Sequence, residues 1–173
     1  MTLLVIDVQK GITDDRLYNF KTFIENLRKL VDAARNHGVE VIYVQHDDGP
    51  GTGFSVGDDE FAIYDEIARR ADEKYFYKTK NSCFSNDKLK EYLKEKGDNC
   101  LVITGLQTNF CIDASIKSAF DLGYDIVVPK NTNSTFDNDY MTGEITYKYY
   151  NEMIWPDRFA KCPTVDETIA MMK

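Results

Sequence analysis

Short runs of apolar residues alternate along this chain with longer segments in which apolar residues recur every three or four positions. The short runs predict strands covered on both faces, and the longer periodic segments predict helices. The runs fall at residues 2–8, 39–44, 74–78, 101–103 and 123–129. The helical segments fall at residues 20–34, 60–70, 85–96, 108–122, 141–151 and 164–172. This alternation predicts the α/β class and a three-layer α/β/α sandwich with a mostly parallel sheet.

The segment 20–34 has the clearest helical pattern. Its apolar side chains share one face and are Phe20, Phe23, Ile24, Leu27, Leu30, Val31 and Ala34. Gly38 is placed to end this helix, and the second strand follows at Val39. A strand, a helix and a strand in this order predict a right-handed crossover and parallel pairing.

Length and charge narrow the possible functions. The 173 residues predict a single domain spanning 1–173. The net charge of −8 argues against a nucleic-acid partner, because phosphate binding requires a basic surface. No apolar run approaches the length of a membrane span and no signal peptide is evident, so we expect no membrane partner. The four cysteines are too few for a disulfide framework, so we expect reduced thiols and a cytoplasmic location.

The stretch from Leu101 to Cys111 carries the strongest chemical signal. A strand, a tight turn at Gly105 and a helix capped by Thr108 would place Cys111 near the third helical position. Unpaired N–H groups and the helix dipole there would make the thiol ionise more easily, and the thiolate is the nucleophilic form. The alternative is that Cys111 is one more small buried residue.

Two charged residues lie at comparable positions on other strands. Asp7 ends the first strand and Lys78 closes the third. The carboxyl ends of parallel strands share one edge of the sheet, so Asp7, Lys78 and Cys111 can converge there. The carboxylate could accept the thiol proton, and the ammonium could stabilise the thiolate. The alternatives are an ordinary polar residue at a strand end for Asp7 and a solvated strand end for Lys78.

Two loops at the same edge are open to more than one interpretation. Residues 46–57 hold four glycines and predict a mobile loop, either a lid carrying Phe54 or a plain surface loop. Residues 131–140 are polar and rich in turn formers. They could donate hydrogen bonds to a substrate or form a solvated turn.

Three motifs resemble those of the isochorismatase-like cysteine hydrolases, a family related to the nicotinamidases. Asp7-Val-Gln9 resembles the opening motif of that family. Lys78, followed by Ser82-Cys-Phe84, resembles its lysine motif. Gly105-Leu-Gln-Thr-Asn-Phe-Cys111 resembles its nucleophile motif. The order and separations of the three fit along nearly the whole chain.

The resemblance implies a Cys–Asp–Lys triad of Cys111, Asp7 and Lys78. It also implies a cis peptide between Leu106 and Gln107 that shapes an oxyanion hole, with N–H groups from Gln107 and Cys111. The implied sheet order is 3-2-1-4-5-6, and the implied assembly is a homodimer or a homotetramer. We expect the substrate pocket to include Gln9, His46, Phe54 and Phe84.

One departure from the resemblance concerns metals. Nicotinamidases carry an Asp-x-His metal site with a further His, whereas this chain has only His37 and His46. His37 lies at a helix end beside Gly38, away from the predicted site. We therefore predict no zinc, no other metal and no cofactor, and we do not expect nicotinamidase activity.

Three functions remain to be separated. The first is cysteine-dependent hydrolysis of a small-molecule amide or related C–N bond through a thioester, with Cys111 as nucleophile. The second is an isochorismatase-type hydrolysis in which Asp7 acts as acid without the thiol, since isochorismatases themselves lack the cysteine. The third is a non-catalytic oligomeric binding protein with the same fold.

Overall fold

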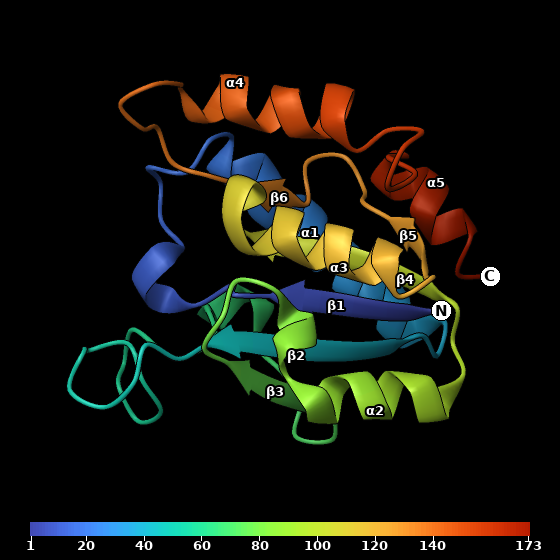
Figure 1. Cartoon of the computed structure of the whole chain (residues 1–173), viewed down its shortest axis with the longest axis horizontal. Helices are drawn as coiled ribbons and strands as arrows, with labels where there is room; N and C mark the ends of the chain where they lie inside the picture. Colours follow the sequence, from blue (N-terminus) through green and yellow to red (C-terminus); the bar gives the residue numbers. More distant parts are fainter.

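The computed structural model describes residues 1–173 and contains one twisted sheet with helices on both faces (Figure 1). The path of hydrogen-bonded strands runs β3-β2-β1-β4-β5, and every pair is parallel. The strands are β1 (Thr2–Ile6), β2 (Glu40–His46), β3 (Lys74–Lys78), β4 (Cys100–Leu106) and β5 (Asp125–Val127). The predicted fold class and the order of these strands are confirmed.

A sixth strand lies beside β4. β6 (Asn133–Ser134) pairs with Gly105 and Leu106, whereas β5 pairs with residues 100–102 at the other end of β4. The position beyond β5 is occupied by the chain near Lys161, which forms an isolated parallel bridge with Val127. β6 therefore lies next to the carboxyl end of β4, directly before the nucleophile turn, residues 108–112, which contains the predicted nucleophile Cys111.

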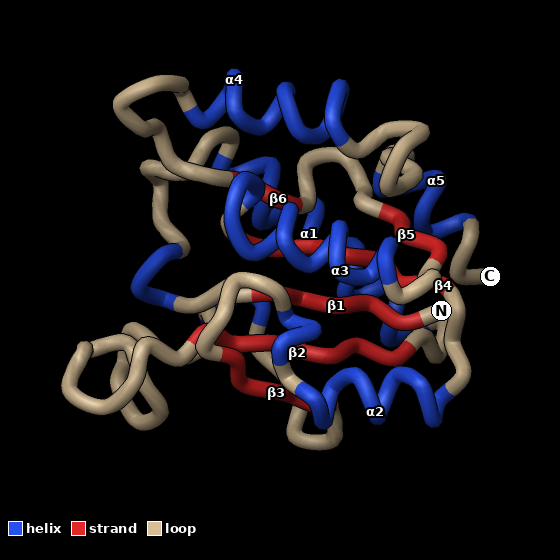
Figure 2. Tube along the Cα trace, viewed as in Figure 1, coloured by secondary structure: helices blue, strands red, loops and turns tan.

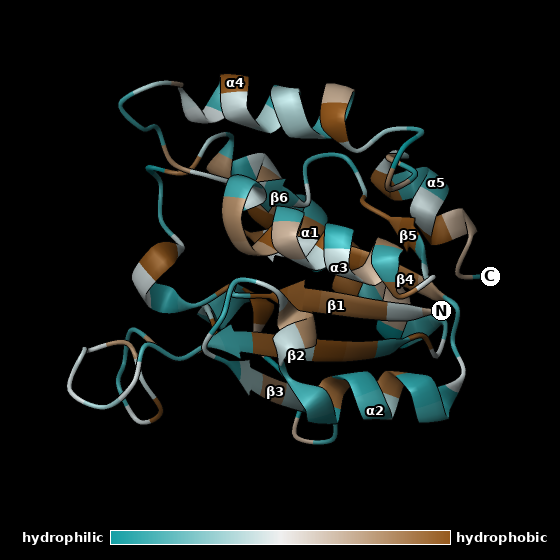
Figure 3. Cartoon of the chain, viewed as in Figure 1, coloured by the Kyte–Doolittle hydropathy of each residue, from teal (hydrophilic) through white to brown (hydrophobic).

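The helices cover the sheet in two layers because alternate residues of each strand face opposite sides. The helices are α1 (Phe20–Asn36), α2 (Asp87–Lys96), α3 (Asp113–Asp121), α4 (Gly143–Lys148) and α5 (Val165–Ala170). Leu3 and Val5 of β1 belong to the core beneath α1 and α5. Leu4 and Ile6 belong to the core beneath α2 and α3. Figure 2 shows these elements along the trace, and Figure 3 shows β1 as hydrophobic along most of its length.

The helix predicted over 60–70 does not form. Only a short helical turn at Asp65–Ile67 is present. The backbone of this segment bonds instead to the chain that follows β1, since the N–H of Tyr64 donates to the Val8 carbonyl. An antiparallel bridge also joins Gln9 to Ile63. Tertiary hydrogen bonds thus replace the local helical ones, which a periodic apolar pattern cannot reveal.

The start of α2 and the end of β4 differ from the sequence prediction. Asn86 caps α2, accepting from the Leu89 N–H, whereas Ser85 lies in the preceding turn. The strand β4 continues through Gly105, where we predicted a tight turn. Gly105 has φ of 119°, and a Cβ there would lie 1.9 Å from the carbonyl oxygen of Ile6. Only glycine allows β4 to pass this close to β1.

None of the helices combines the length and the apolar character that crossing a membrane requires.

Candidate active site

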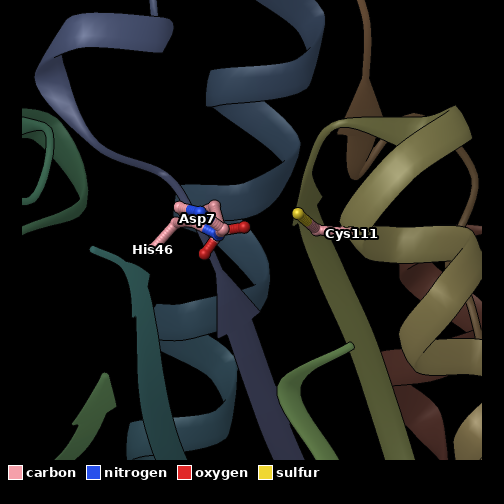
Figure 4. Close-up of side chains that lie close together, drawn as sticks. All are labelled: Asp7, His46 and Cys111. Carbon is pink, nitrogen blue, oxygen red and sulfur yellow. The ribbon is translucent and has the colours of Figure 1, made fainter. Parts of the chain in front are cut away.

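The structure brings Asp7, Lys78 and Cys111 together at the carboxyl edge of the sheet. The Nζ atom of Lys78 lies 2.7 Å from Oδ2 of Asp7 and 3.2 Å from Sγ of Cys111. Asp7 is 1% exposed and Lys78 is 3% exposed, while Cys111 is half-buried. Figure 4 shows the Asp7 carboxylate and the Cys111 sulfur facing one another between the ends of two strands. The convergence predicted from the sequence is therefore present.

Asp7 owes its position to an unusual backbone conformation. It follows β1 directly and has φ of 54°, in the left-handed region that aspartate adopts more readily than most residues. Its N–H still donates to the Val44 carbonyl, at 2.8 Å, so the pairing with β2 extends one residue beyond the strand. The left-handed turn ends β1 and leaves the carboxylate at the sheet edge.

Lys78 reaches Asp7 from a strand that is not adjacent to β1. It is the last residue of β3 and is paired with His46 of β2, which lies between β3 and β1. Because neighbouring strands are about 4.8 Å apart, the backbones of β3 and β1 are separated by roughly 10 Å. A lysine side chain is long enough to cross the end of β2.

His46 supplies a third partner for Lys78. Its Nδ1 atom lies 3.0 Å from Nζ, and its Nε2 atom lies 3.1 Å from Oδ1 of Asp48. An ammonium group has donors only, so Nδ1 must accept and the ring proton must sit on Nε2. The three ammonium protons then have three acceptors, on Asp7, His46 and Cys111.

The same three acceptors form a set of possible metal ligands. Ligand atoms of Asp7, His46 and Cys111 all lie within 4.8 Å of one another. The Lys78 Nζ atom lies within 3.2 Å of each of these side chains. The ammonium therefore holds the position between these ligands, and a metal ion bound by all three would have to displace it.

The pKa of the thiol contradicts our prediction that Cys111 ionises easily. The pKa of Cys111 is raised to about 12, first by burial and then by the negative charge of Asp7, while Lys78 opposes both. Burial also raises the pKa of Asp7, again opposed by Lys78. One ammonium compensates one negative charge, so the geometry accommodates a single anion beside Lys78, either the Asp7 carboxylate or the Cys111 thiolate.

The turn before Cys111 explains why the expected helix N-terminus is absent. Residues 108–112 form a wide π-helical turn, and α3 begins only at Asp113. The Gln107 carbonyl accepts from the N–H groups of Phe110 and Ile112. The Thr108 hydroxyl caps nothing and donates to Asn133 instead. Cys111 thus lies in this turn and not in the first turn of a regular α-helix.

The peptide bond between Leu106 and Gln107 is cis. The backbone N–H of Gln107 takes part in none of the hydrogen bonds within the protein. It therefore remains available to a ligand beside Cys111.

The family model for the isochorismatase domain matches residues 1–151. The chain belongs to the isochorismatase family. Among its relatives, the isochorismatase family protein YrdC of Bacillus subtilis is 30% identical, with 96% of this chain and 93% of that protein covered. The ureidoacrylate amidohydrolase RutB of Agrobacterium fabrum is 25% identical over 88% of this chain and 84% of its own. Streptothricin hydrolase of Streptomyces noursei is 25% identical over 78% of this chain and 50% of its own.

Solved structures of the isochorismatase family have the same fold. One isochorismatase family protein matches with a TM-score of 0.86 and 30% identity, over 94% of this chain and 97% of that one. A cysteine hydrolase from Pseudomonas syringae matches with a TM-score of 0.90 over 99% of this chain and 91% of its own. Its identity is 19%, so this second likeness shows the fold alone.

Two other residues of this isochorismatase-family hydrolase that we expected in the substrate pocket, Gln9 and Phe84, are buried in the protein. Gln9 is fully buried, and its amide bonds to both backbone groups of His46 and to the Phe61 carbonyl. Phe84 lies in the core beneath α3 with its ring against Tyr124. Both side chains contribute to the interior of the protein, and their place in the substrate pocket stays a prediction. Their motifs signalled their importance but not this role.

Phe54 and the loop that carries it are held by internal contacts. The Phe54 carbonyl accepts from the Asp48 N–H, and its ring lies edge-on to Phe61 at 6.4 Å. Oδ1 of Asp47 accepts from the Ser55 hydroxyl at 2.6 Å. Figure 1 shows this loop extending beyond the sheet edge. The loop has a defined internal structure, although all four of its glycines have positive φ.

The stretch 131–140 contains the largest departure from the sequence interpretation in this hydrolase. We expected substrate donors or a solvated turn, yet residues 132–135 are at most 1% exposed. Ser134 donates to the Tyr18 carbonyl, and Thr135 donates to Oδ1 of Asn109 at 2.6 Å, with Oε1 of Gln107 at 3.2 Å. These hydroxyls bond to the protein itself, around the nucleophile turn.

Sequence reasoning missed Asn81. Its Oδ1 atom lies 4.0 Å from Sγ of Cys111, and the residue is exposed. It stands inside the segment 78–84 that carries the lysine motif, which is the one signal that could have indicated it. A cavity of about 270 Å³ opens beside Lys78 and is lined in part by Asp47, Tyr77 and Asn86. A larger one of about 530 Å³ lies beside β5, away from these side chains.

Proposed function

We propose that this isochorismatase-family hydrolase cleaves a small-molecule amide or related C–N bond through a thioester on Cys111. The observation that carries the proposal is the free carboxylate oxygen beside the thiol. Oδ1 of Asp7 is buried without a hydrogen-bond partner, and the carboxylate lies within 4.8 Å of Sγ. A buried unpartnered acceptor is costly, and a proton transferred from sulfur would satisfy it. The relatives whose names specify amide hydrolysis support the same reaction class.

The first step forms the thioester. Asp7 takes the proton of Cys111 as sulfur attacks the carbonyl carbon, and the carbonyl electron pair moves onto oxygen. Because the pKa of Cys111 is raised to about 12, deprotonation by Asp7 accompanies the attack and does not precede it. When the C–N bond breaks, Asp7 returns the proton to the leaving nitrogen.

The oxyanion needs donors beside the reacting carbon. The N–H of Gln107, which no protein group uses, and the N–H of Cys111 are our candidates for this role. Fixed backbone donors stabilise developing charge in a tetrahedral intermediate, and the loss of one costs about 10²–10³-fold in rate in well-studied cases. Lys78 meanwhile holds Asp7 and Cys111 in place and balances the single negative charge that passes between them.

The second step hydrolyses the thioester. Asp7 takes a proton from water, whose oxygen attacks the thioester carbon. Sulfur then leaves and recovers a proton from Asp7, which restores the resting carboxylate, ammonium and thiol. A carboxylic acid is released, and no atom of the protein is consumed.

A panel of small primary amides and ureides, assayed for ammonia release, tests this proposal. We expect turnover of at least one compound by the wild type and its loss in Cys111→Ala. Cys100→Ala is a matched control, because Cys100 begins β4, the strand that leads to Cys111, at the opposite edge of the sheet. Turnover that survives Cys111→Ala but not Asp7→Asn would replace the thioester route with acid catalysis by Asp7 alone. A wild type that cleaves nothing and whose Cys111 is labelled by iodoacetamide with the pH profile of an ordinary cysteine would favour a binding protein.

A further inference from the structure

Three buried polar side chains connect the nucleophile turn to the helical segment Tyr149–Ile154, which continues α4. The Thr108 hydroxyl donates to Oδ1 of Asn133 at 2.7 Å. Asn133 and Asn151 then form two reciprocal amide hydrogen bonds, at 2.8 and 3.0 Å. All three residues are at most 3% exposed. Figure 1 shows β6 beneath α4, beside the amino-terminal end of α3.

The orientations of the Asn151 and Asn133 side-chain amides follow from one contact with a backbone carbonyl of the helix. Nδ2 of Asn151 lies 3.0 Å from the Tyr147 carbonyl oxygen, which can only accept. That contact fixes which end of the Asn151 amide is nitrogen. Oδ1 of Asn133 must then face this nitrogen, and the same oxygen remains as acceptor for the Thr108 hydroxyl.

The network leads from the helix to the reacting sulfur. Thr108 stands three residues before Cys111 within one turn, and Asn133 is paired with Gly105 in the sheet. Movement of Thr108 would break its hydrogen bond to Asn133. The buried polar groups would then lack partners, which is destabilising. A displacement of about 1 Å at a reacting group can cost on the order of 100-fold in rate.

We propose that Asn151 and Thr108 are positioning residues, which act through Asn133 to hold Cys111 against Asp7 and Lys78. The inference rests on the proposed function only where turnover is the readout. Neither residue touches the reacting atoms, so their loss should change the geometry of attack and leave substrate binding largely intact.

The first test compares two buried threonines, Thr108 in the turn at 108–112 and Thr104 on β4. Thr108→Val keeps the shape and removes the hydroxyl; we expect kcat to fall about tenfold or more with KM within about twofold. Thr108→Ser keeps the hydroxyl and should stay within about threefold of the wild type. The matched control is Thr104→Val, because Thr104 is also fully buried on β4 and its hydroxyl bonds to the Leu4 carbonyl instead. An equal loss in Thr104→Val, or none in Thr108→Val, would overturn the proposal.

The second test asks whether the two ends act as one unit. Asn151→Ala should lower kcat by a similar factor, and the double variant Thr108→Val/Asn151→Ala should be no worse than the more damaged single variant. Tyr147→Phe is the control, since it removes the acceptor of the Asn131 N–H from the same helix without breaking the network. Additive losses in the double variant, with thermal unfolding unchanged, would refute the coupling.

A third readout is independent of any substrate. The pH profile of iodoacetamide labelling at Cys111, resolved by peptide mass spectrometry, should shift to lower pH by about one unit in Thr108→Val. Burial and the negative charge of Asp7 raise the pKa of Cys111, and a sulfur released from its place beside Asp7 would lose both effects. Labelling of Cys100 in the same molecules controls for general loosening. A shift here without amide turnover in the wild type would sustain the network and reject the proposed function; no shift would reject the network.

Discussion

The ammonium of Lys78 lies 2.7 Å from Oδ2 of Asp7, although their strands are separated in the sheet by β2. Both side chains are buried, so each charge depends on the other. The breaking of a buried ion pair from one side leaves an uncompensated charge, whereas removal of both partners is often nearly neutral. A comparison of variants that lack one charge or both can therefore separate the effect of this pair on stability from its effect on catalysis.

Lys78→Met should destabilise the protein by about 3–5 kcal/mol at pH 8, as measured by urea unfolding, because the Asp7 carboxylate loses its only cation. Since burial raises the folded-state pKa of Asp7, the contribution of this carboxyl to stability is full below its unfolded pKa and is lost as pH rises through the folded value. The defect in Lys78→Met should accordingly be smaller at pH 5 than at pH 8.

The double variant Asp7→Asn/Lys78→Met is the control for that experiment. It should recover most of the lost stability while remaining inactive, because no charge is left without a partner. A Lys78→Met protein as stable as the wild type at pH 8 would show that the pair is not needed to keep either charge buried.

The pH dependence of thiol alkylation should report the raised pKa of Cys111. Labelling by iodoacetamide should continue to accelerate towards about pH 12, whereas an ordinary cysteine levels off above its pKa near 8.5. In Asp7→Asn the profile should move to lower pH, because the charge that disfavours the thiolate is gone. Identical profiles for the wild type and Asp7→Asn would be inconsistent with this cluster.

Much of the site was predictable because its residues end strands. Asp7 and Lys78 interrupt apolar runs, and the parallel order then places both at one edge with Cys111. The state of the thiol was not predictable, because it depends on burial and on the distance to Asp7, neither of which a local motif contains. The hydrogen bond from Thr108, in the π-helical turn at 108–112, likewise reaches a partner 25 residues away, Asn133, which a local motif does not reveal.

The fold, too, was predictable where local sequence determines it and not where tertiary contacts do. The helix at Phe20–Asn36 and the strand at Lys74–Lys78 follow from local periodicity and were predicted closely. The chain at 60–70 has a helical pattern yet bonds to the end of β1, and the polar stretch at 131–135 is buried because its hydroxyls find partners within the protein. Polarity indicates exposure only where no such partner exists.

His46→Ala should lower kcat by about tenfold or more, because Lys78 loses one acceptor and a hydrogen bond to a charged group contributes about 1.5–3 kcal/mol. Asp48→Asn keeps His46 and should stay within about threefold, since Asp48 touches only the far ring nitrogen and is half exposed. Steady-state kinetics on any amide that the wild type cleaves measures both. Equal losses in the two variants would show that His46 does not act through Lys78.

Gly105→Ala should prevent folding, because the added Cβ would meet the Ile6 carbonyl oxygen at 1.9 Å. Gly97→Ala is the matched control: Gly97 also has positive φ, but its Cβ would meet open space. We expect Gly97→Ala to cost about 1 kcal/mol by circular dichroism in urea, the ordinary cost of the left-handed conformation. A folded, stable Gly105→Ala protein would mean that β1 and β4 do not approach each other this closely.

The central claim is that Cys111 carries the acyl group during turnover, and acid quench followed by mass spectrometry tests it most directly. With an amide that the wild type cleaves, the peptide containing Cys111 should gain the mass of the acyl group. That gain should be absent in Cys111→Ala and greater in a variant that attacks but hydrolyses slowly. Steady turnover with no acyl mass on Cys111, together with an active Cys111→Ala, would contradict the account.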